Sequence, residues 1–81
     1  MDDRDIVRRI SQFVDEEHKL YQQAEQRHGL TDDETARLRG LELLLDQCWD
    51  LLRQRRARRE FGLDPDAATL RDATTVERYE A

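Results

Sequence analysis

Apolar residues recur at alternating spacings of four and three through the first part of the chain. The stripe consists of Ile6, Ile10, Phe13, Leu20 and Ala24, with Glu17 at the one polar position of the series, and Val7, Val14 and Tyr21 widen it. This period is that of an amphipathic α-helix. It predicts a helix over about residues 3–28, roughly 39 Å long at a rise of 1.5 Å per residue. Gly29 follows where a left-handed residue commonly ends a helix.

A second helical block begins with the segment Thr31–Glu34, which has the form of a capping box. In such a box the Thr31 hydroxyl accepts from the Glu34 amide, and the Glu34 carboxylate accepts from the Thr31 amide. The apolar positions that follow are Leu38, Leu41, Leu45, Cys48 and Leu52, with Leu44, Trp49 and Leu51 beside them. They predict a helix over about residues 32–61 with an apolar arc of about 160° at 100° per residue.

The two helices are joined by only two or three residues, which forces an antiparallel hairpin. A hairpin gives each helix one neighbour, so the wide arc of the second helix needs another covering surface. We expect a second copy of the chain to supply it, giving a two-fold four-helix bundle. The interface is predicted at Leu44, Trp49 and Leu51.

The alternative cover is the C-terminal tail, residues 63–81, which carries two arginines against five acidic residues. Its apolar residues are Leu63, Leu70, Val76 and Tyr79. The pair Asp64-Pro65 resembles a helix start and predicts a short turn. We expect the tail to be loosely docked.

Composition fits a single all-α domain. The chain has 81 residues, 41% of them charged, with a mean hydropathy of -1.00. Such polarity approaches that of disordered chains, but the regular apolar spacing favours helices. No apolar run reaches the roughly 20 residues that cross a bilayer, and the start of the chain lacks a signal-peptide core. One cysteine and no membrane segment lead us to expect a cytoplasmic protein.

Five of the seven residues from Arg53 to Arg59 are arginine. One interpretation is a nucleic-acid-binding element, which gains affinity by releasing counterions from phosphates. The net charge of -5 and the scarcity of aromatic residues argue against it. The hairpin instead places the acidic residues Asp2, Asp3 and Asp5 beside Arg55, Arg56 and Arg59, leaving Arg53 and Arg58 to face a partner.

Glu17 interrupts the apolar stripe of the first helix, which predicts a polar group in the core with a register-fixing role. The neighbouring Asp15 and His18 have the Glu-x-x-His type of spacing found in carboxylate metal bundles. Both fall outside the apolar stripe, so a solvated face is favoured over a metal site. Neither a phosphate-binding glycine loop nor a nucleophile and base pair is present. We therefore expect no catalytic residue, no metal and no cofactor.

The segment Leu45–Gly62, LDQCWDLLRQRRARREFG, resembles a small bacterial family that is best represented in actinobacteria and is known only as a domain of unknown function. The resemblance extends to the DEEH-x-L segment at Asp15–Leu20 and the Val-Glu-x-Tyr segment at Val76–Tyr79. It implies a stand-alone cytoplasmic protein and assigns no activity, substrate or catalytic residue.

These observations predict a non-catalytic homodimeric interaction or structural module whose partner is another protein. Two other functions stay open. One is a nucleic-acid-associated regulator that uses Arg53–Arg59, and the other is a metal-binding or ligand-binding bundle around Asp15, Glu17 and His18.

Overall fold

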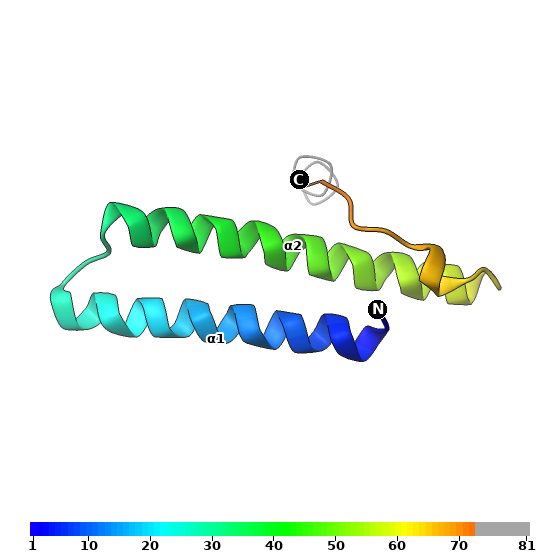
Figure 1. The fold of residues 1–81 in the computed structure, drawn as a ribbon, viewed down its shortest axis with the longest axis horizontal. Coiled ribbons are helices and arrows are strands. Elements are labelled where there is room, and N and C mark those ends of the chain that lie inside the picture. Colours follow the sequence, from blue (N-terminus) through cyan, green and yellow to red (C-terminus); the bar gives the residue numbers. More distant parts are fainter. Residues whose placement is uncertain (73–81) are drawn as a thin grey trace.

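Two long helices lie antiparallel in the computed structural model, which describes residues 1–72 (Figure 1). Helix α1 spans Asp3–Arg27, α2 spans Asp32–Glu60, and the short 3-10 helix η1 spans Pro65–Ala67. The predicted all-α hairpin is confirmed, and both predicted helix ends lie one residue too far. None of the helices in residues 1–72 contains a segment long and apolar enough to cross a membrane.

Both helices begin with a capping box. At α2 the Glu34 amide donates to Thr31 Oγ1 over 3.1 Å and the Thr31 amide donates to Glu34 Oε1 over 2.9 Å, as predicted. At α1 the Asp5 amide donates to Asp2 Oδ1, and the Asp2 amide donates to Asp5 Oδ2. The first acidic residues of the chain therefore satisfy amides that the helix itself leaves without partners.

Each helix ends in a Schellman motif, in which a left-handed residue lets two amides reach back to the last turn. At the end of α1 the Gly29 amide donates to the Ala24 carbonyl and the His28 amide to the Glu25 carbonyl. The left-handed residue is His28, with φ 61°, rather than Gly29 as predicted. Histidine is among the residues that tolerate this conformation. At the end of α2 the same role belongs to Gly62, with φ 71°.

The core runs along the seam between α1 and α2. Its main cluster joins Ile6 and Ile10 to Cys48 and Leu51, and Leu38 and Leu41 are buried nearer the loop. Phe13, Leu45, Leu52 and Ala68 pack against the main cluster. Leu51 thus lies inside the hairpin and not on the outer face where a dimer interface was expected. Its burial follows from its side of α2, which meets both α1 and the segment that contains Ala68.

Residues 63–72, which we call the strap, turn back along α2 in the opposite direction to that helix (Figure 1). The Gln47 side chain donates to the Arg71 carbonyl over 3.1 Å, and the Gln54 side chain donates to the Thr69 carbonyl over 2.8 Å. Leu63 and Leu70 are both exposed, so polar contacts and Ala68 hold the strap. Val76 and Tyr79, predicted to cover the hairpin, lie outside the described residues.

Candidate functional site

Arg55 is the buried member of the arginine run, and its side chain is only 7% exposed. Its Nε donates to Asp3 Oδ1 over 2.6 Å, and its Nη1 donates to Asp66 Oδ1 over 3.0 Å. Nη1 also donates to the Pro65 carbonyl over 3.2 Å. A single guanidinium therefore joins the start of α1, the end of α2 and the strap. A planar group with five donors is suited to such a junction.

The rest of the run is partly neutralised in the same way. Arg59 Nη2 lies 2.8 Å from Asp3 Oδ2, and Arg56 Nε donates to Glu60 Oε1 over 3.3 Å. The prediction that acidic residues of α1 answer the run is therefore met by Asp3. Asp2 and Asp5 do not take part, because each is engaged in capping α1.

The two arginines expected to face a partner differ in exposure. Arg58 is half-buried on the strap side of α2, so it is not the outward-pointing cation that the helical wheel suggested. Arg53 is exposed and lines a hollow together with Trp49, but it is not without an interaction of its own. The run thus offers fewer available cations than its sequence indicates.

Ion pairing shifts the pKa of both partners at the junction. The hydrogen bond from Arg55, followed by that from Arg59, lowers the pKa of Asp3 below its ordinary value of 3.8. The hydrogen bonds to Asp3 and Asp66 raise the pKa of Arg55. Both shifts favour the charged forms, so the junction is an ion-pair network at neutral pH.

Two further ion pairs join α1 to α2 nearer the loop. The Arg37 guanidinium donates two hydrogen bonds to the Glu16 carboxylate, one of them over 2.9 Å. Arg27 pairs with Glu34, the capping residue of α2. These contacts lower the pKa of Glu16 through its hydrogen bond from Arg37. The pKa of Glu34 falls mainly through the Thr31 amide and then through Arg27.

Asp50 is a buried carboxylate that sequence reasoning did not single out. Its side chain is 5% exposed, accepts a hydrogen bond from Gln54 over 2.9 Å and lies 3.6 Å from Arg71 Nη1. The strap covers Asp50. Because the strap has no regular spacing of apolar residues, its position over Asp50 could not be predicted from the sequence pattern. The signal available in the sequence is the spacing of Gln47, Asp50 and Gln54, which places three polar residues on one side of α2.

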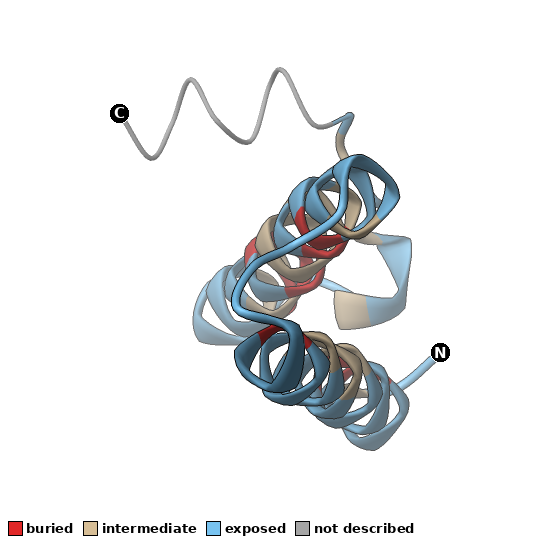
Figure 2. Cartoon of the chain, turned by 90° about the vertical axis from the view of Figure 1, so that its left-hand side faces the viewer, coloured by how far each residue is buried: buried red, intermediate tan, exposed pale blue. Residues whose placement is uncertain are grey.

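The flank of the hairpin opposite the strap is open within residues 1–72 (Figure 2). Four large apolar residues remain about half exposed: Val7 at 50%, Val14 at 47%, Tyr21 at 49% and Trp49 at 49%. At 100° per residue, the α1 residues lie about 80° to one side of its buried stripe, and Trp49 lies about 80° to one side of the α2 stripe. In antiparallel helices these two directions face the same flank. We call this surface the open flank.

Two shallow hollows agree with this placement. Asp3 lines one of about 310 Å³ together with Trp49 and Leu52. It also lines a neighbouring one of about 470 Å³ that contains Val7. Asp3 therefore marks the point where the α1 and α2 parts of the open flank meet. Leu44, predicted for the same surface, is half-buried and lies on the other side of α2.

The polar residues of the metal hypothesis do not converge. Glu17 is half-buried, whereas Asp15 and His18 are exposed. Within residues 1–72, no three His, Cys, Asp or Glu side chains are close enough together to hold a metal ion. At 100° per residue, Glu17 lies about 20° from the centre of the buried stripe of α1, on the same side as Val14. It is therefore at the edge of the seam that faces the open flank.

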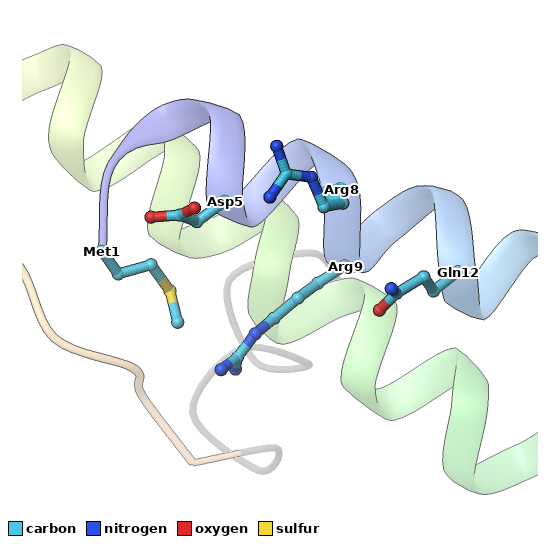
Figure 3. A pocket seen from close by; sticks show the side chains of 5 residues that line it. All are labelled: Met1, Asp5, Arg8, Arg9 and Gln12. Atoms are coloured by element: carbon cyan, nitrogen blue, oxygen red, sulfur yellow. The ribbon is translucent and has the colours of Figure 1, made fainter.

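On the strap side, a hollow of about 340 Å³ is lined by Met1, Asp5, Arg8, Arg9 and Gln12 (Figure 3). The Arg9 side chain extends away from α1 on the same side as the Met1 side chain. Asp5 accepts from the Asp2 amide and so belongs to the cap of α1. The lining residues that the structure describes include no nucleophile paired with a base, and they give no catalytic arrangement.

Cys48 is a buried free cysteine in the main core cluster. Burial raises the pKa of its thiol above the ordinary value of 9.0. The thiolate is the reactive form, so burial and the raised pKa both make this residue inert in the folded protein. This agrees with the expected core role.

Comparison with known proteins places the chain in a family. A family model described as a protein of unknown function, DUF2630, matches residues 2–81. The chain belongs to this family. Uncharacterized proteins of Mycobacterium bovis and Mycobacterium tuberculosis are each 47% identical to it over 79 residues, covering 95% of this chain and 88% of theirs. No solved structure matches the chain. The resemblance to a small bacterial family of unknown function is thus confirmed.

Proposed function

We propose that this member of the DUF2630 family is a non-catalytic helical interaction module that acts as a homodimer. The observation that supports the proposal is the open flank, where Val7, Val14, Tyr21 and Trp49 leave about half of each side chain in water. Half-exposed apolar residues occur singly on most proteins, but a set aligned along one flank of a thin hairpin is typical of an interface.

The geometry of the flank suits a second hairpin. In a four-helix bundle each helix contacts two neighbours in directions roughly 90° apart, and the two apolar directions on α1 and on α2 are about 80° apart. The molecule measures 51 × 25 × 15 Å, so its broad face is larger than the roughly 800 Å² that each partner buries in a standard interface. A second copy offers the same apolar surface, so one contact covers the open flanks of both copies.

The proposal is tested by the mass of the protein in solution. Sedimentation equilibrium at micromolar concentration should give about twice the chain mass of 9.7 kDa. Val14→Glu places a charge at the centre of the flank and should give a monomer that keeps its helical circular dichroism. Gln23→Glu adds the same charge to α1 about half a turn away from the flank and should leave the dimer intact.

A monomer of the unmodified chain would contradict the proposal, and a truncated chain ending at residue 72 then identifies the cover. If truncation shifts Trp49 emission to longer wavelength in that monomer, the flank belongs to the chain's own C-terminal residues. An unshifted emission would mean that the flank faces water in the isolated protein. Either result overturns the homodimer.

The nucleic-acid hypothesis is less well supported, because Arg55, Arg56 and Arg59 each pair with a carboxylate. Phosphate contacts would have to replace those pairs before they released counterions. We expect no salt-sensitive binding to duplex DNA or single-stranded RNA at about 50 mM salt. Binding that weakens steeply as salt rises, and that Arg53→Gln reduces, would restore this function as the better candidate.

A further inference from the structure

The open flank has a regular spacing that specifies how two copies meet. Val7, Val14 and Tyr21 are separated by seven residues, so they lie almost in line along α1 with Val14 in the middle. A two-fold axis beside Val14 brings Val14 against its own copy and Val7 against Tyr21 of the second copy. Each outer layer of the antiparallel α1 pair then joins one large and one small apolar side chain, and the central layer joins two valines. This inference rests on the proposed homodimer and adds its orientation.

Charge favours the antiparallel orientation over the parallel one. A parallel two-fold would set the arginine-rich ends of both α2 helices side by side, and it would place Arg4 beside its own copy. The antiparallel arrangement separates those ends along the 51 Å molecule. It also brings Arg4 to the level of Glu25 of the second copy, and the two-fold repeats that pair. Asp3 does not oppose this arrangement, because Arg55 and Arg59 already neutralise it.

Trp49 occupies a matching position on α2. The pairs Asp3–Arg55 and Arg27–Glu34 fix the register of the hairpin at its two ends. Interpolating between them places Trp49 about one helical turn from the level of Val14. An axis beside Val14 therefore places the two Trp49 side chains on opposite sides of the axis, about two helical turns apart, where each would pack against the second copy and lose its contact with water.

We propose that a second copy of the chain packs antiparallel on the open flank, with the two-fold axis beside Val14, Trp49 about one helical turn from that axis, and Arg4 facing Glu25 of the second copy. The interface is then formed mainly by α1 with α1, and each Trp49 packs against the open flank of the second copy. Leu51 and the strap lie on the far side and take no part.

Cysteine crosslinking of the folded full-length chain tests the orientation. Val14→Cys should form a covalent dimer under mild oxidation, since the two residues meet at the axis. Val7→Cys should not crosslink to itself, but a mixture of Val7→Cys and Tyr21→Cys should give the mixed dimer. The unmodified chain is the control for Cys48, which is buried and should not react.

Efficient crosslinking of Val7→Cys to itself would show a parallel pair and overturn the proposed orientation. Failure of both Val14→Cys and the mixed pair, in a protein that sediments as a dimer, would also overturn it while leaving the homodimer in place. A monomer by sedimentation would remove the orientation together with the function it rests on.

Exchanging the charges of Arg4 and Glu25 tests the position of the two-fold axis independently. Arg4→Glu should raise the dimer dissociation constant about 2- to 10-fold, because two symmetric exposed pairs are lost. Glu25→Arg in the same chain should restore the original value. Arg39→Glu with Glu25→Arg is the matched control, because Arg39 lies on α2 near the loop, far from the level of Glu25 of the second copy, and should give no rescue. Equal rescue by both combinations would contradict the assigned pair.

Discussion

At the scale of single residues, Arg55 contributes most to the arrangement of the chain. Its guanidinium is buried where three segments meet, and it bonds to two carboxylates and one backbone carbonyl. Its neighbour Arg56 has a similar sequence environment but is 78% exposed and pairs only with Glu60 in the next turn. Adjacent arginines of one run thus have different structural roles, because one faces the hairpin seam and the other faces water.

Arg55→Met should lower the melting temperature by about 5 °C, because it removes the cation that joins Asp3, Asp66 and the Pro65 carbonyl. Arg56→Met should shift it by about 1 °C or less, as expected for an exposed pair. Differential scanning calorimetry at fixed protein concentration compares the two. Equal shifts would mean that burial of Arg55 adds nothing to stability.

The lowered pKa of Asp3 links stability to pH. Folded Asp3 binds its proton less readily than unfolded Asp3, whose pKa is near the ordinary 3.8. Its contribution is therefore complete above about pH 5 and is lost as pH falls through the folded pKa. Asp3→Asn should be less stable than the unmodified chain at pH 7, and the two should converge near pH 2.

Urea unfolding from pH 2 to pH 7 measures this difference. Asp2, Glu16 and Glu34 also have lowered pKa values, so the Asp3→Asn variant should keep part of its acid sensitivity. A constant difference between the two proteins at all pH values would show that the Asp3 charge is not the cause.

At the scale of the elements, the ends of the helices were better specified by sequence than the strap. The Thr31 and Glu34 box was predicted atom by atom, because a capping box is a local pattern with a fixed spacing. The Asp2 and Asp5 box has the same spacing, but the antiparallel hairpin predicts these residues beside the arginine run. Asp3 alone fulfils that role, since neighbouring residues on a helix point in different directions.

The contacts of the strap could not be predicted from period or spacing. Gln47 and Gln54 donate to backbone carbonyls of residues 15 to 24 positions away, and any residue supplies such a carbonyl. The burial of Asp50 depends on the same segment. Leu51 was assigned to the outer face for the same reason, because the wide arc of α2 did not reveal that Ala68 would help to cover it.

Two glycines, one inside α2 and one just after its end, should respond oppositely to alanine. Gly40 lies within the helix, and a Cβ there would meet no atom within 4 Å, so Gly40→Ala should raise stability by about 0.5–1 kcal/mol. Gly62 has φ 71°, which costs other residues about 1–2 kcal/mol, so Gly62→Ala should lower stability by about that amount. Urea denaturation of both variants provides the comparison. Destabilisation by Gly40→Ala would indicate a neighbour that needs the missing Cβ.

At the scale of the whole molecule, the hairpin is long and thin, and its two flanks differ. The strap covers one flank of the hairpin with polar contacts to α2, while the open flank keeps four half-exposed apolar residues, three on α1 and one on α2. A hairpin of this size buries little surface alone, so much of its stability should come from a partner surface. The sequence predicts an uncovered apolar surface from the wide arc of α2. In the structure, most of the uncovered apolar residues lie on α1 instead.

The stability of a homodimer depends on its concentration. A tenfold dilution weakens association by about 1.4 kcal/mol per dimer and should lower the melting temperature by a few degrees. Trp49 emission should shift to longer wavelength over the same dilution series. The Val14→Glu variant should show neither effect. A melting temperature that is independent of concentration in the unmodified chain would be incompatible with coupled folding and dimerisation.

The position of Cys48 gives a way to follow this protein among other proteins. Its thiol lies between α1 and α2, so a thiol-reactive label can reach it only when the helices separate. The labelling rate therefore reports how often the hairpin opens. Any molecule that binds the closed hairpin slows that rate, whatever its chemical class. Fractions of a cell extract can accordingly be screened for the physiological partner before that partner has been identified.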